Sequence, residues 1–426
     1  MSSSSTPRPL PGGLTLRLSV MMFLQYAIWG AWLPILYPFL LGHRQFELGQ
    51  VGQVLAAGAL GAIIGPFIAG QIADRWFSTE RFLAVSHLAG AYLVWRLADT
   101  TDFATFLALS AFYGVIYAPT LALTNALAFH HIPDRDRDFG RIRLWGTIGW
   151  IVVGIAVGQW LLLKHTPANV ASELVQAAQD AGRADAFRLS AYLGIFMGIY
   201  CLTLPHTPPD REAKTNASLA ALGSIRKQPL LALFLIAVPI SCIHQFYFVF
   251  AADFLSAYGR DAAGAINKIF GVGGGGLMTI GQMSEIPVLA AIPLLARRVS
   301  RKGLLMTGIL AYAARMALFA YTDSLPTVLL GVALHGLCFG CFVFVAFMVV
   351  DEETTADVRA SAQNLFNLVI VGIGIGVGSW VSTQVGAWAT VGGQMDFTKL
   401  FGAAMWAALV CLALLAVIYP GQPRKA

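Results

Sequence analysis

Charged side chains are scarce in this sequence. Asp, Glu, Lys and Arg make up 12% of its 426 residues, while 57% of the residues are hydrophobic. An ordinary soluble domain carries about twice that share of charge, so too few polar groups are present to cover a water-soluble globule. The aromatic share of 12% and the many aliphatic residues exclude an intrinsically disordered chain. The composition therefore indicates a protein embedded in a membrane.

Concentrated positive charge, paired cysteines and cofactor motifs are also missing. The net charge of +6 is spread thinly over the chain, so no nucleic-acid partner is expected. The five cysteines lie in apolar runs without disulfide or zinc-ligand spacing. No Walker-type phosphate loop, His-Glu-x-x-His motif or carboxylate cluster occurs, so we expect no direct use of ATP, no metal and no cofactor. These absences argue against an enzyme.

Long apolar runs, by contrast, are abundant. A helix needs roughly 20 mostly apolar residues to cross a bilayer, and twelve such stretches can be identified. The predicted spans are 16–41, 48–72, 82–99, 103–129, 140–163, 187–204, 229–256, 269–296, 303–322, 327–350, 360–385 and 398–419. The first is interpreted as a retained helix, because it carries no signal-peptide cleavage pattern. We therefore expect an all-α polytopic membrane protein with twelve transmembrane helices.

Basic residues are distributed unevenly between these spans. If both termini lie inside, 19 Lys and Arg side chains fall in inner segments and 7 in outer segments. An excess of Lys and Arg is typical of cytoplasmic loops. The charge pattern therefore predicts an even number of spans with both termini in the cytoplasm.

A polar, proline-containing segment divides the chain into two blocks of six spans. Similar marks recur in both blocks about 220 residues apart: a basic turn follows the second and the eighth span, and an Asp-to-Arg stretch precedes the fifth and the eleventh. Such a repeat predicts two related halves. The expected organisation is a tail over 1–13, a six-helix bundle over 14–204, a cytoplasmic linker over 205–228, a second bundle over 229–419 and a tail over 420–426.

The turn after the second span carries Gly70, Asp74 and Arg75 in the pattern Gly-x-x-x-Asp-Arg, which resembles the loop signature of the major facilitator superfamily. Other stretches resemble the nucleoside:proton symporter family of that superfamily, over about residues 20 to 420. They are Gln25–Leu33, Tyr117–Leu123, Ile142–Gly149, Leu202–His206, Gln282–Glu285 and Arg359–Gln363. The resemblance implies two pseudo-symmetric six-helix bundles in a bacterial cytoplasmic membrane. It further implies a secondary active transporter that imports nucleosides with protons by alternating access.

Few ionisable or amide groups occur inside the predicted spans, and such groups are usually functional or paired. Glu285 lies near the middle of the eighth span, with Gln282 three residues earlier on the same helical face. A carboxylate there can take a proton from outside and release it inside. Alternatively it forms a structural pair with Arg315 of the ninth span or Arg143 of the fifth.

The fifth span carries three side chains that suit a polar, ring-containing solute. Arg143, Thr147 and Trp150 recur at helical spacing, so they share one face that offers a cation, a hydroxyl and a flat aromatic surface. The alternative role for Arg143 is an anchor at the lipid headgroups. We predict that this face contributes to a substrate site.

Two more spans carry histidines, which titrate near neutral pH unless their surroundings change this. His244 and Gln245 lie in the seventh span, and His335 and Phe339 are four residues apart in the tenth. A histidine in a helix can equally be a packing group with a satisfied ring. The predicted proton-coupling residues are Glu285 and His335. The loop with Gly70, Asp74 and Arg75 is the predicted gate.

The resemblance assigns substrate contact to a set of residues and also marks departures from the family pattern. By resemblance, the nucleoside-contacting residues carry over at Arg143, Thr147, Gln245, Gln282, Glu285 and Phe339. The predicted substrate site also includes Trp150, where the family can have Phe, and His335. His335 stands where a Tyr is expected, Phe248 where an Asn is expected, and Gly340 where an acid is expected. The last departure places more of the proton-coupling role on Glu285 and His335.

Two other classes of function are alternatives to this interpretation. The first is a facilitator or symporter for another polar solute such as a sugar, or a drug exporter of the same superfamily. The second is a membrane-embedded enzyme or sensor, which would need a cluster of nucleophile, base or metal ligands within the spans. A mixture of amide, carboxylate, arginine and aromatic groups suits a base joined to a ribose. The expected partners are therefore a nucleoside or similar small polar solute, protons and the lipid bilayer, with the protein acting as a monomer.

Overall fold

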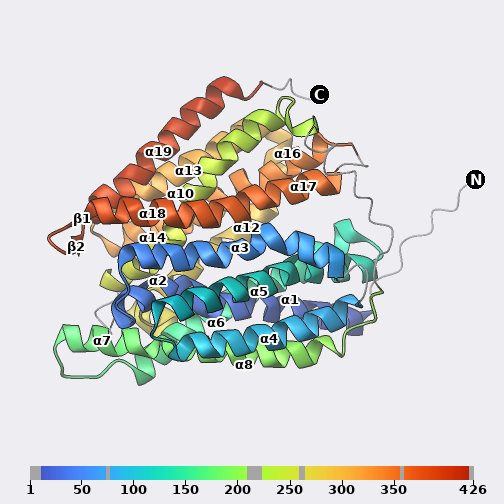
Figure 1. Ribbon diagram of the computed structural model, residues 1–426. Helices are drawn as coiled ribbons and strands as arrows, with labels where there is room; N and C mark the ends of the chain where they lie inside the picture. Colours follow the sequence, from blue (N-terminus) through green and yellow to red (C-terminus); the bar gives the residue numbers. More distant parts are fainter. Residues whose placement is uncertain (1–10, 73–76, 209–222, 259–263, 356–358, 422–426) are drawn as a thin grey trace, which may run out of the picture.

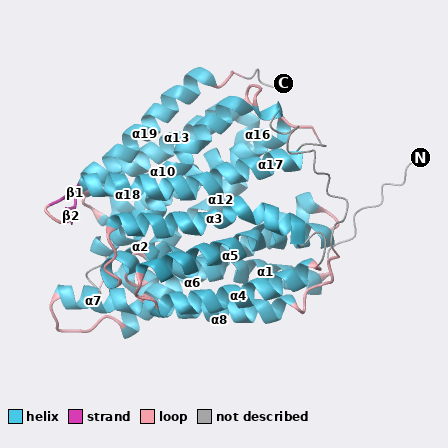
Figure 2. Ribbon diagram, viewed as in Figure 1, coloured by secondary structure: helices cyan, strands magenta, loops and turns pink. Residues whose placement is uncertain are grey.

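The computed structural model describes residues 11–72, 77–208, 223–258, 264–355 and 359–421. Most of the described chain is helical, and the long helices run back and forth along one common direction (Figures 1 and 2). At one end, which we call the terminal end, the first helix begins and the last helix finishes. At the opposite end, the hairpin end, lies a short antiparallel hairpin of β1 (Thr390–Val391) and β2 (Gln394–Met395).

Helices of the first half of the sequence gather on one side of the molecule, drawn from blue to green in Figure 1. A short helix, α7, protrudes at the hairpin end. The elements are α1 (Gly12–Trp32), η1 (Leu33–Ile35), α2 (Leu36–Pro38), η2 (Phe39–His43), α3 (Leu48–Ile72), α4 (Thr79–Asp99), α5 (Phe103–His131), α6 (Arg135–Lys164), α7 (Ser172–Gly182) and α8 (Ala184–Cys201).

Helices of the second half gather on the other side, drawn from yellow-green to red. They are α10 (Leu230–Tyr258), α11 (Ala265–Phe270), α12 (Gly275–Arg298), α13 (Arg301–Tyr321), α14 (Leu325–Ala333), α15 (His335–Leu337), η3 (Cys338–Phe344), α16 (Val345–Glu352), α17 (Arg359–Asn367), η4 (Leu368–Ile373), α18 (Gly374–Ala389) and α19 (Phe397–Ile418). The two halves meet where α3 contacts α18 and where α6 contacts α12.

Each of the twelve predicted stretches overlaps a helix. Within the described residues, nine helical segments are both long and apolar enough to cross a bilayer. Large apolar side chains are exposed along them, including Leu163, Trp406 and Val417. Exposing such side chains to water costs free energy, whereas contact with the apolar lipid tails does not. The structure is thus that of an all-α, multi-pass membrane protein.

One predicted boundary is wrong. The sequence predicts that the eighth span begins at residue 269, but residues 269 and 270 end the separate helix α11, and α12 begins at Gly275. Between them the backbone takes positive φ at Gly271, Gly273 and Gly274. Continuous helix is impossible in that conformation, which glycine tolerates because it has no Cβ.

Three predicted spans are irregular helices. The first contains a 3₁₀ turn, η1, followed by the π turn η2, the tenth contains the π turn η3, and the eleventh contains the π turn η4. A π turn inserts a residue into the helical repeat and is frequent at functional sites. Spacing rules for a regular helix therefore hold on α6 and α12 but not through Cys338–Phe344.

The two halves press together closely at the hairpin end. The amide of Val272 donates to the carbonyl of Gly158 across the interface, N to O 3.0 Å. A Cβ added to Gly158 would lie 2.4 Å from the carbonyl oxygen of Phe270, so only glycine allows this approach. Tyr37 and Phe250 stack edge to face nearby, with ring centroids 4.9 Å apart. We call these contacts the interhalf seal.

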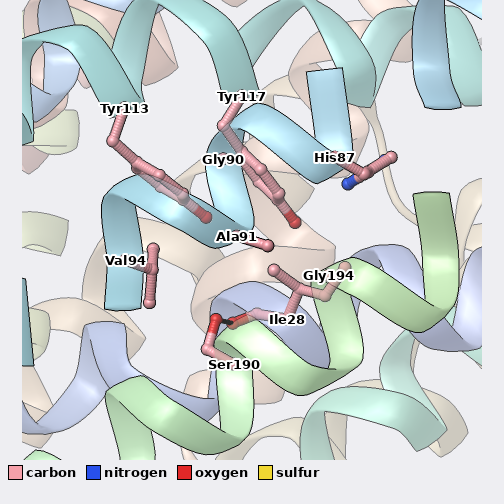
Figure 3. Close-up of a pocket in the computed structure, with 9 residues that line it drawn as sticks. All are labelled: Ile28, His87, Gly90, Ala91, Val94, Tyr113, Tyr117, Ser190 and Gly194. Carbon is pink, nitrogen blue, oxygen red and sulfur yellow. Dashed lines mark hydrogen bonds between the residues drawn. The ribbon is translucent and has the colours of Figure 1, made fainter. Parts of the chain in front are cut away.

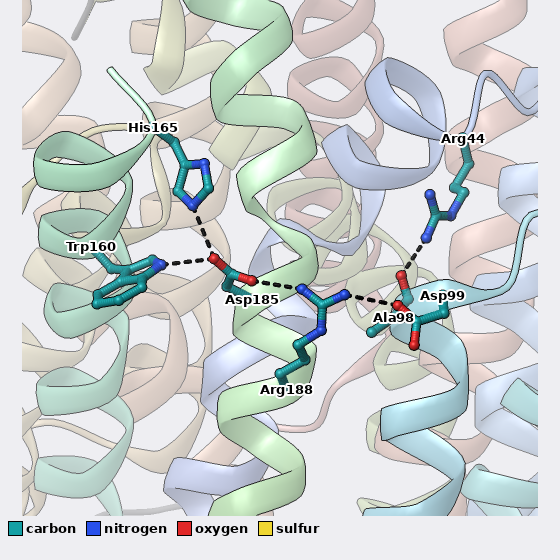
Figure 4. Close-up of polar contacts among 7 residues, drawn as sticks. All are labelled: Arg44, Ala98, Asp99, Trp160, His165, Asp185 and Arg188. Carbon is teal, nitrogen blue, oxygen red and sulfur yellow. Dashed lines mark hydrogen bonds and ion pairs between the residues drawn. The ribbon is translucent and has the colours of Figure 1, made fainter. Parts of the chain in front are cut away.

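A polar network ties the helices of the first half together at the same end (Figure 4). Asp185 of α8 accepts hydrogen bonds from Trp160 Nε1 and His165 Nε2, each at 2.9 Å, and from Arg188 Nη1 at 2.8 Å. Arg188 also pairs with Asp99 of α4 at 2.8 Å, and Arg44 donates to the carbonyl of Ala98. The turns of α4, α6 and α8 at the hairpin end and the turn after η2 are thereby held as one body.

Part of the predicted organisation lies outside the described residues. Asp74 and Arg75 fall in the segment 73–76, and most of the predicted linker falls in 209–222. Gly70 lies within α3. The first described helix begins at Gly12, and the last ends at Ile418.

Candidate functional site

Two of the predicted site residues form a direct pair in the second half. Glu285 of α12 and His335 of α15 approach each other with Oε1 3.0 Å from Nε2. Both are nearly buried, with 9% and 1% of their surface exposed. The helices can approach closely because Gly281 and Gly336 face the partner helix, where any Cβ would lie under 3 Å from it. The carboxylate is therefore held by a histidine rather than left alone in an apolar interior.

Arg315 of α13 lies behind this pair. Its Nη1 is 2.9 Å from His335 Nδ1, and the whole side chain is buried. The guanidinium also lies over the rings of Tyr247 and Tyr312, at 4.4 and 5.1 Å from their centroids. Sequence reasoning considered a direct Glu285–Arg315 pair. The structure instead inserts His335 between them, because α15 lies between α12 and α13 at this level.

Aromatic rings of α10 enclose His335. The rings of Tyr247 and His244 stack on it, with centroids 5.1 and 5.4 Å away, and Phe248 meets it edge-on at 5.8 Å. His244 Nδ1 is itself hydrogen-bonded to the hydroxyl of Tyr312 at 2.7 Å. His244 is thus a packed, partnered ring, which matches the packing alternative considered for it.

The face of α6 predicted to contribute to the substrate site belongs to the first half of the chain and lies against the rings around His335. Trp150 meets Phe248 edge to face at 6.4 Å, which links α6 to α10. Arg143 stacks over the ring of Tyr26 at 3.9 Å, and its charge acts on Glu285. Since α6 is unbroken from Arg135 to Lys164, Thr147 shares the face of Arg143 and Trp150. The site therefore lies between the halves.

The other predicted residues differ in their contacts. Gln282 lies one turn before Glu285, is 6% exposed, and its Oε1 has no hydrogen-bond partner among the described residues. Gln245 donates to Ser379 Oγ at 3.0 Å. Phe339 is half-buried and lies in the π turn η3, which removes the simple four-residue relation to His335. Within the described chain, no hydrogen bond joins Gln245 or Thr147 to Glu285.

Two of the positions that depart from the family pattern, Phe248 and Gly340, have clear structural surroundings. Phe248 fills the space between Trp150 and His335 with an aromatic ring. At Gly340, an added Cβ would lie 2.6 Å from Val288 Cγ1. An acidic side chain at position 340 would therefore require α12 and η3 to separate or Val288 to move.

Sequence reasoning missed a buried polar network in the first half. His87 of α4 bonds through Nε2 to Gln25 Oε1 at 3.0 Å, and Gln25 Nε2 donates to Thr120 Oγ1 at 2.8 Å. Tyr117 donates to the backbone carbonyl of Gln25. A histidine inside the third predicted span was the available signal, but its partner Gln25 is 62 residues away, and Gln25 is itself 95 residues from Thr120.

This network borders a small internal space (Figure 3). His87 of α4, Tyr113 and Tyr117 of α5 and Ser190 of α8 are among the residues that line it. The space does not admit a water molecule. It is a packing gap within the first half, and a solute the size of a nucleoside has no room there.

The residues between the halves offer a defined set of chemical properties. A carboxylate with a histidine donor can change its charge, an unpartnered amide oxygen can accept from a hydroxyl or amine, and Trp150 and Phe248 offer ring faces. Arg143 supplies fixed positive charge from the opposite half. These are the kinds of group that can bind a small polar molecule with a ring and exchange one proton.

Comparison with known proteins is consistent with this chemistry. The family described as "Nucleoside H+ symporter" matches residues 13–422. The chain is 35% identical over 369 residues to the YegT protein of Escherichia coli (strain K12), covering 84% of this chain and 81% of YegT. It is 30% identical to the nucleoside permease NupG of the same organism, covering 91% of each chain.

Solved structures show the same fold. A crystal structure of the nucleoside transporter NupG superposes with a TM-score of 0.80 at 26% identity, covering 96% of this chain and 100% of that one. A D-xylose–proton symporter superposes with a TM-score of 0.66 at 13% identity, covering 96% of this chain and 98% of that one, which supports the fold alone. The architecture is that of the major facilitator fold.

Proposed function

The chain belongs to the nucleoside H+ symporter family, and from this premise we propose that it imports nucleosides with protons across a bacterial cytoplasmic membrane. It is a multi-pass membrane transporter with the major facilitator fold. Both termini face the cytoplasm in this proposal, supported by the 19 basic residues expected on that side against 7 on the other. The hairpin end is then the outer end.

The observation that carries the proposal is the Glu285–His335 pair beside Gln282, at the interface of the halves. Glu285 binds the proton, and His335 holds the carboxyl group of Glu285 in place. The partnerless oxygen of Gln282 accepts a hydrogen bond from the nucleoside, because a buried amide oxygen left unsatisfied is costly. Thus a proton and a substrate are bound within one helical turn.

The remaining predicted contacts are assigned roles on the same basis. Trp150 stacks on the base from the first half, Arg143 and Thr147 hydrogen-bond from the same face, and Gln245 and Phe339 complete the second half of the site. Because both halves of one chain supply these groups, a monomer suffices. Gating by Gly70, Asp74 and Arg75 stays a prediction from the sequence pattern.

The proposal is tested by uptake into proteoliposomes that contain the purified protein. Labelled nucleosides and sugars are compared with and without an imposed pH gradient. We expect nucleosides alone to accumulate, and only when the outside is more acidic. Uptake of nucleosides that ignores both the gradient and an uncoupler would show a facilitator, and uptake of sugars alone would show a different substrate class.

Replacing Gln282 by Ala should weaken nucleoside binding. The substitution removes one buried hydrogen-bond partner, which typically costs about 1–3 kcal/mol, or roughly 5- to 150-fold in affinity. Equilibrium binding of a labelled nucleoside to the purified protein measures this. Gln394→Ala serves as the matched control, because Gln394 is exposed in β2. Binding as tight as in the parent would show that Gln282 does not contact the substrate.

A further inference from the structure

The two ring nitrogens of His335 have different partners, and this fixes where its proton lies. Arg315 Nη1 is 2.9 Å from Nδ1, and Glu285 Oε1 is 3.0 Å from Nε2. An arginine carries only donors and stays charged in proteins. Nδ1 must therefore accept from Arg315, and the single proton of the neutral ring is on Nε2, where it is donated to Glu285.

Binding of a second proton to His335 is strongly unfavourable. The proton would have to sit on Nδ1 and point at an N–H of the guanidinium, so two donors and two positive charges would face each other at 2.9 Å. Arg315 cannot turn aside freely, because it is fully buried and its guanidinium lies against the rings of Tyr247 and Tyr312. The contact with Nδ1 is therefore a fixed part of the packing.

We propose that Arg315 is a positioning residue that holds His335 as a permanently neutral Nε2–H donor, so that Glu285 alone carries the transported proton. This rests on the proposed function and divides the predicted coupling pair into two unlike roles. Proton binding converts the carboxylate of Glu285 to a carboxylic acid, while His335 and Arg315 keep their protons. The local charge thus changes by one.

The other titratable groups around the pair agree with this assignment. His244 stacks on His335 and is bonded to a tyrosine hydroxyl, so a charge on either ring would be repelled by Arg315. Arg143 acts on Glu285 from α6 and stays charged. The titratable or charged groups that face the pair from α6, α10 and α13 are Arg143, His244, Tyr247, Tyr312 and Arg315. Cys338 of η3 lies near Tyr312.

The first test measures the protonation of the two ring nitrogens of His335. The full-length protein is labelled with ¹⁵N in its histidine rings and placed in lipid bilayers for NMR, where a protonated and a bare ring nitrogen resonate far apart. The signals of His335 are identified by their loss in His335→Asn. We expect a protonated Nε2 and a bare Nδ1 that do not change between about pH 5 and 8, the range in which ordinary histidines titrate. A proton on Nδ1, or titration of the parent ring in this range, overturns the proposal.

The second test uses substitutions at Arg315. In Arg315→Met the donor to Nδ1 is lost, so His335 should titrate; in Arg315→Lys an ammonium can still donate, so the neutral form should persist. Nucleoside affinity measured against pH should change by at most about tenfold per pH unit in the parent, because one proton is linked to binding. A steeper dependence in the parent means that a second group is protonated.

These readouts separate the inference from the proposed function. The NMR result needs no transport, so it stands whether or not nucleosides are the substrate. Proton-driven nucleoside uptake by the parent together with a titrating His335 would overturn the role of Arg315 and leave the proposed function intact. If Arg315→Met does not fold, the NMR of the parent still decides.

Discussion

Replacing Glu285 by Gln should abolish concentrative uptake while leaving downhill exchange partly intact. The amide keeps the shape of the side chain and can still accept from His335 Nε2, but it cannot bind a proton. With one proton per substrate, a gradient of one pH unit can sustain an accumulation of about tenfold. We expect the accumulation ratio of the variant to stay near one in proteoliposomes, at any imposed gradient.

The matched control for this variant is Glu173→Gln. Glu173 is exposed in the first turn of α7, away from the interface of the halves. Its loss of charge should leave both accumulation and exchange unchanged. Gradient-driven accumulation by the Glu285→Gln protein would place the coupling group elsewhere, whereas loss of both activities would indicate that the carboxylate is needed for substrate binding as well.

Sequence analysis predicted the helices well because hydropathy is a local property. Each apolar stretch must satisfy its backbone internally, so a helix follows from about 20 apolar residues whatever its neighbours are. The exceptions are local departures that packing decides. Residues 269 and 270 are apolar enough for a span, but the chain turns at Gly271 because it packs against α6 there.

The site was predicted less completely because its geometry depends on contacts between distant helices. A buried carboxylate at position 285 and a histidine at 335 were both visible in the sequence, and each had several conceivable partners. Only the arrangement of α12, α13 and α15 shows that His335 lies between Glu285 and Arg315. The π turn η3 likewise changes the face on which Phe339 lies, and no pattern in the sequence predicts this turn.

Enlarging Gly158 should disfavour closure of the hairpin end and slow transport. Alternating access requires the interhalf seal to form and break in every cycle. In the closed arrangement, a Cβ at position 158 would meet the carbonyl oxygen of Phe270 at 2.4 Å and Gly271 Cα at 3.3 Å. These are backbone atoms of a turn with φ +74° at Gly271, so they cannot yield as a flexible side chain would.

The expected size of this effect follows from the cost of overpacking. Forcing extra carbon atoms into a close contact typically costs about 1–3 kcal/mol, which disfavours the closed arrangement roughly 5- to 150-fold. Gly158→Ala should therefore reduce the maximal rate of uptake, and Gly158→Val should reduce it further. Spin labels at Leu174 of α7 and Val391 of β1, both exposed at the hairpin end, should report a larger separation in the variants.

A control on the same helix separates closure from helix stability. Gly140 also lies in α6, but a Cβ there would meet nothing within 4 Å. Gly140→Val imposes a comparable change in helix propensity without touching the other half, so its uptake and label separation should equal those of the parent. If Gly158→Val also matches the parent in both measurements, the halves do not need the seal at Gly158 in order to transport. If both variants lose activity alike, the loss comes from α6 itself, because only position 158 lies against Phe270 and the turn that follows it.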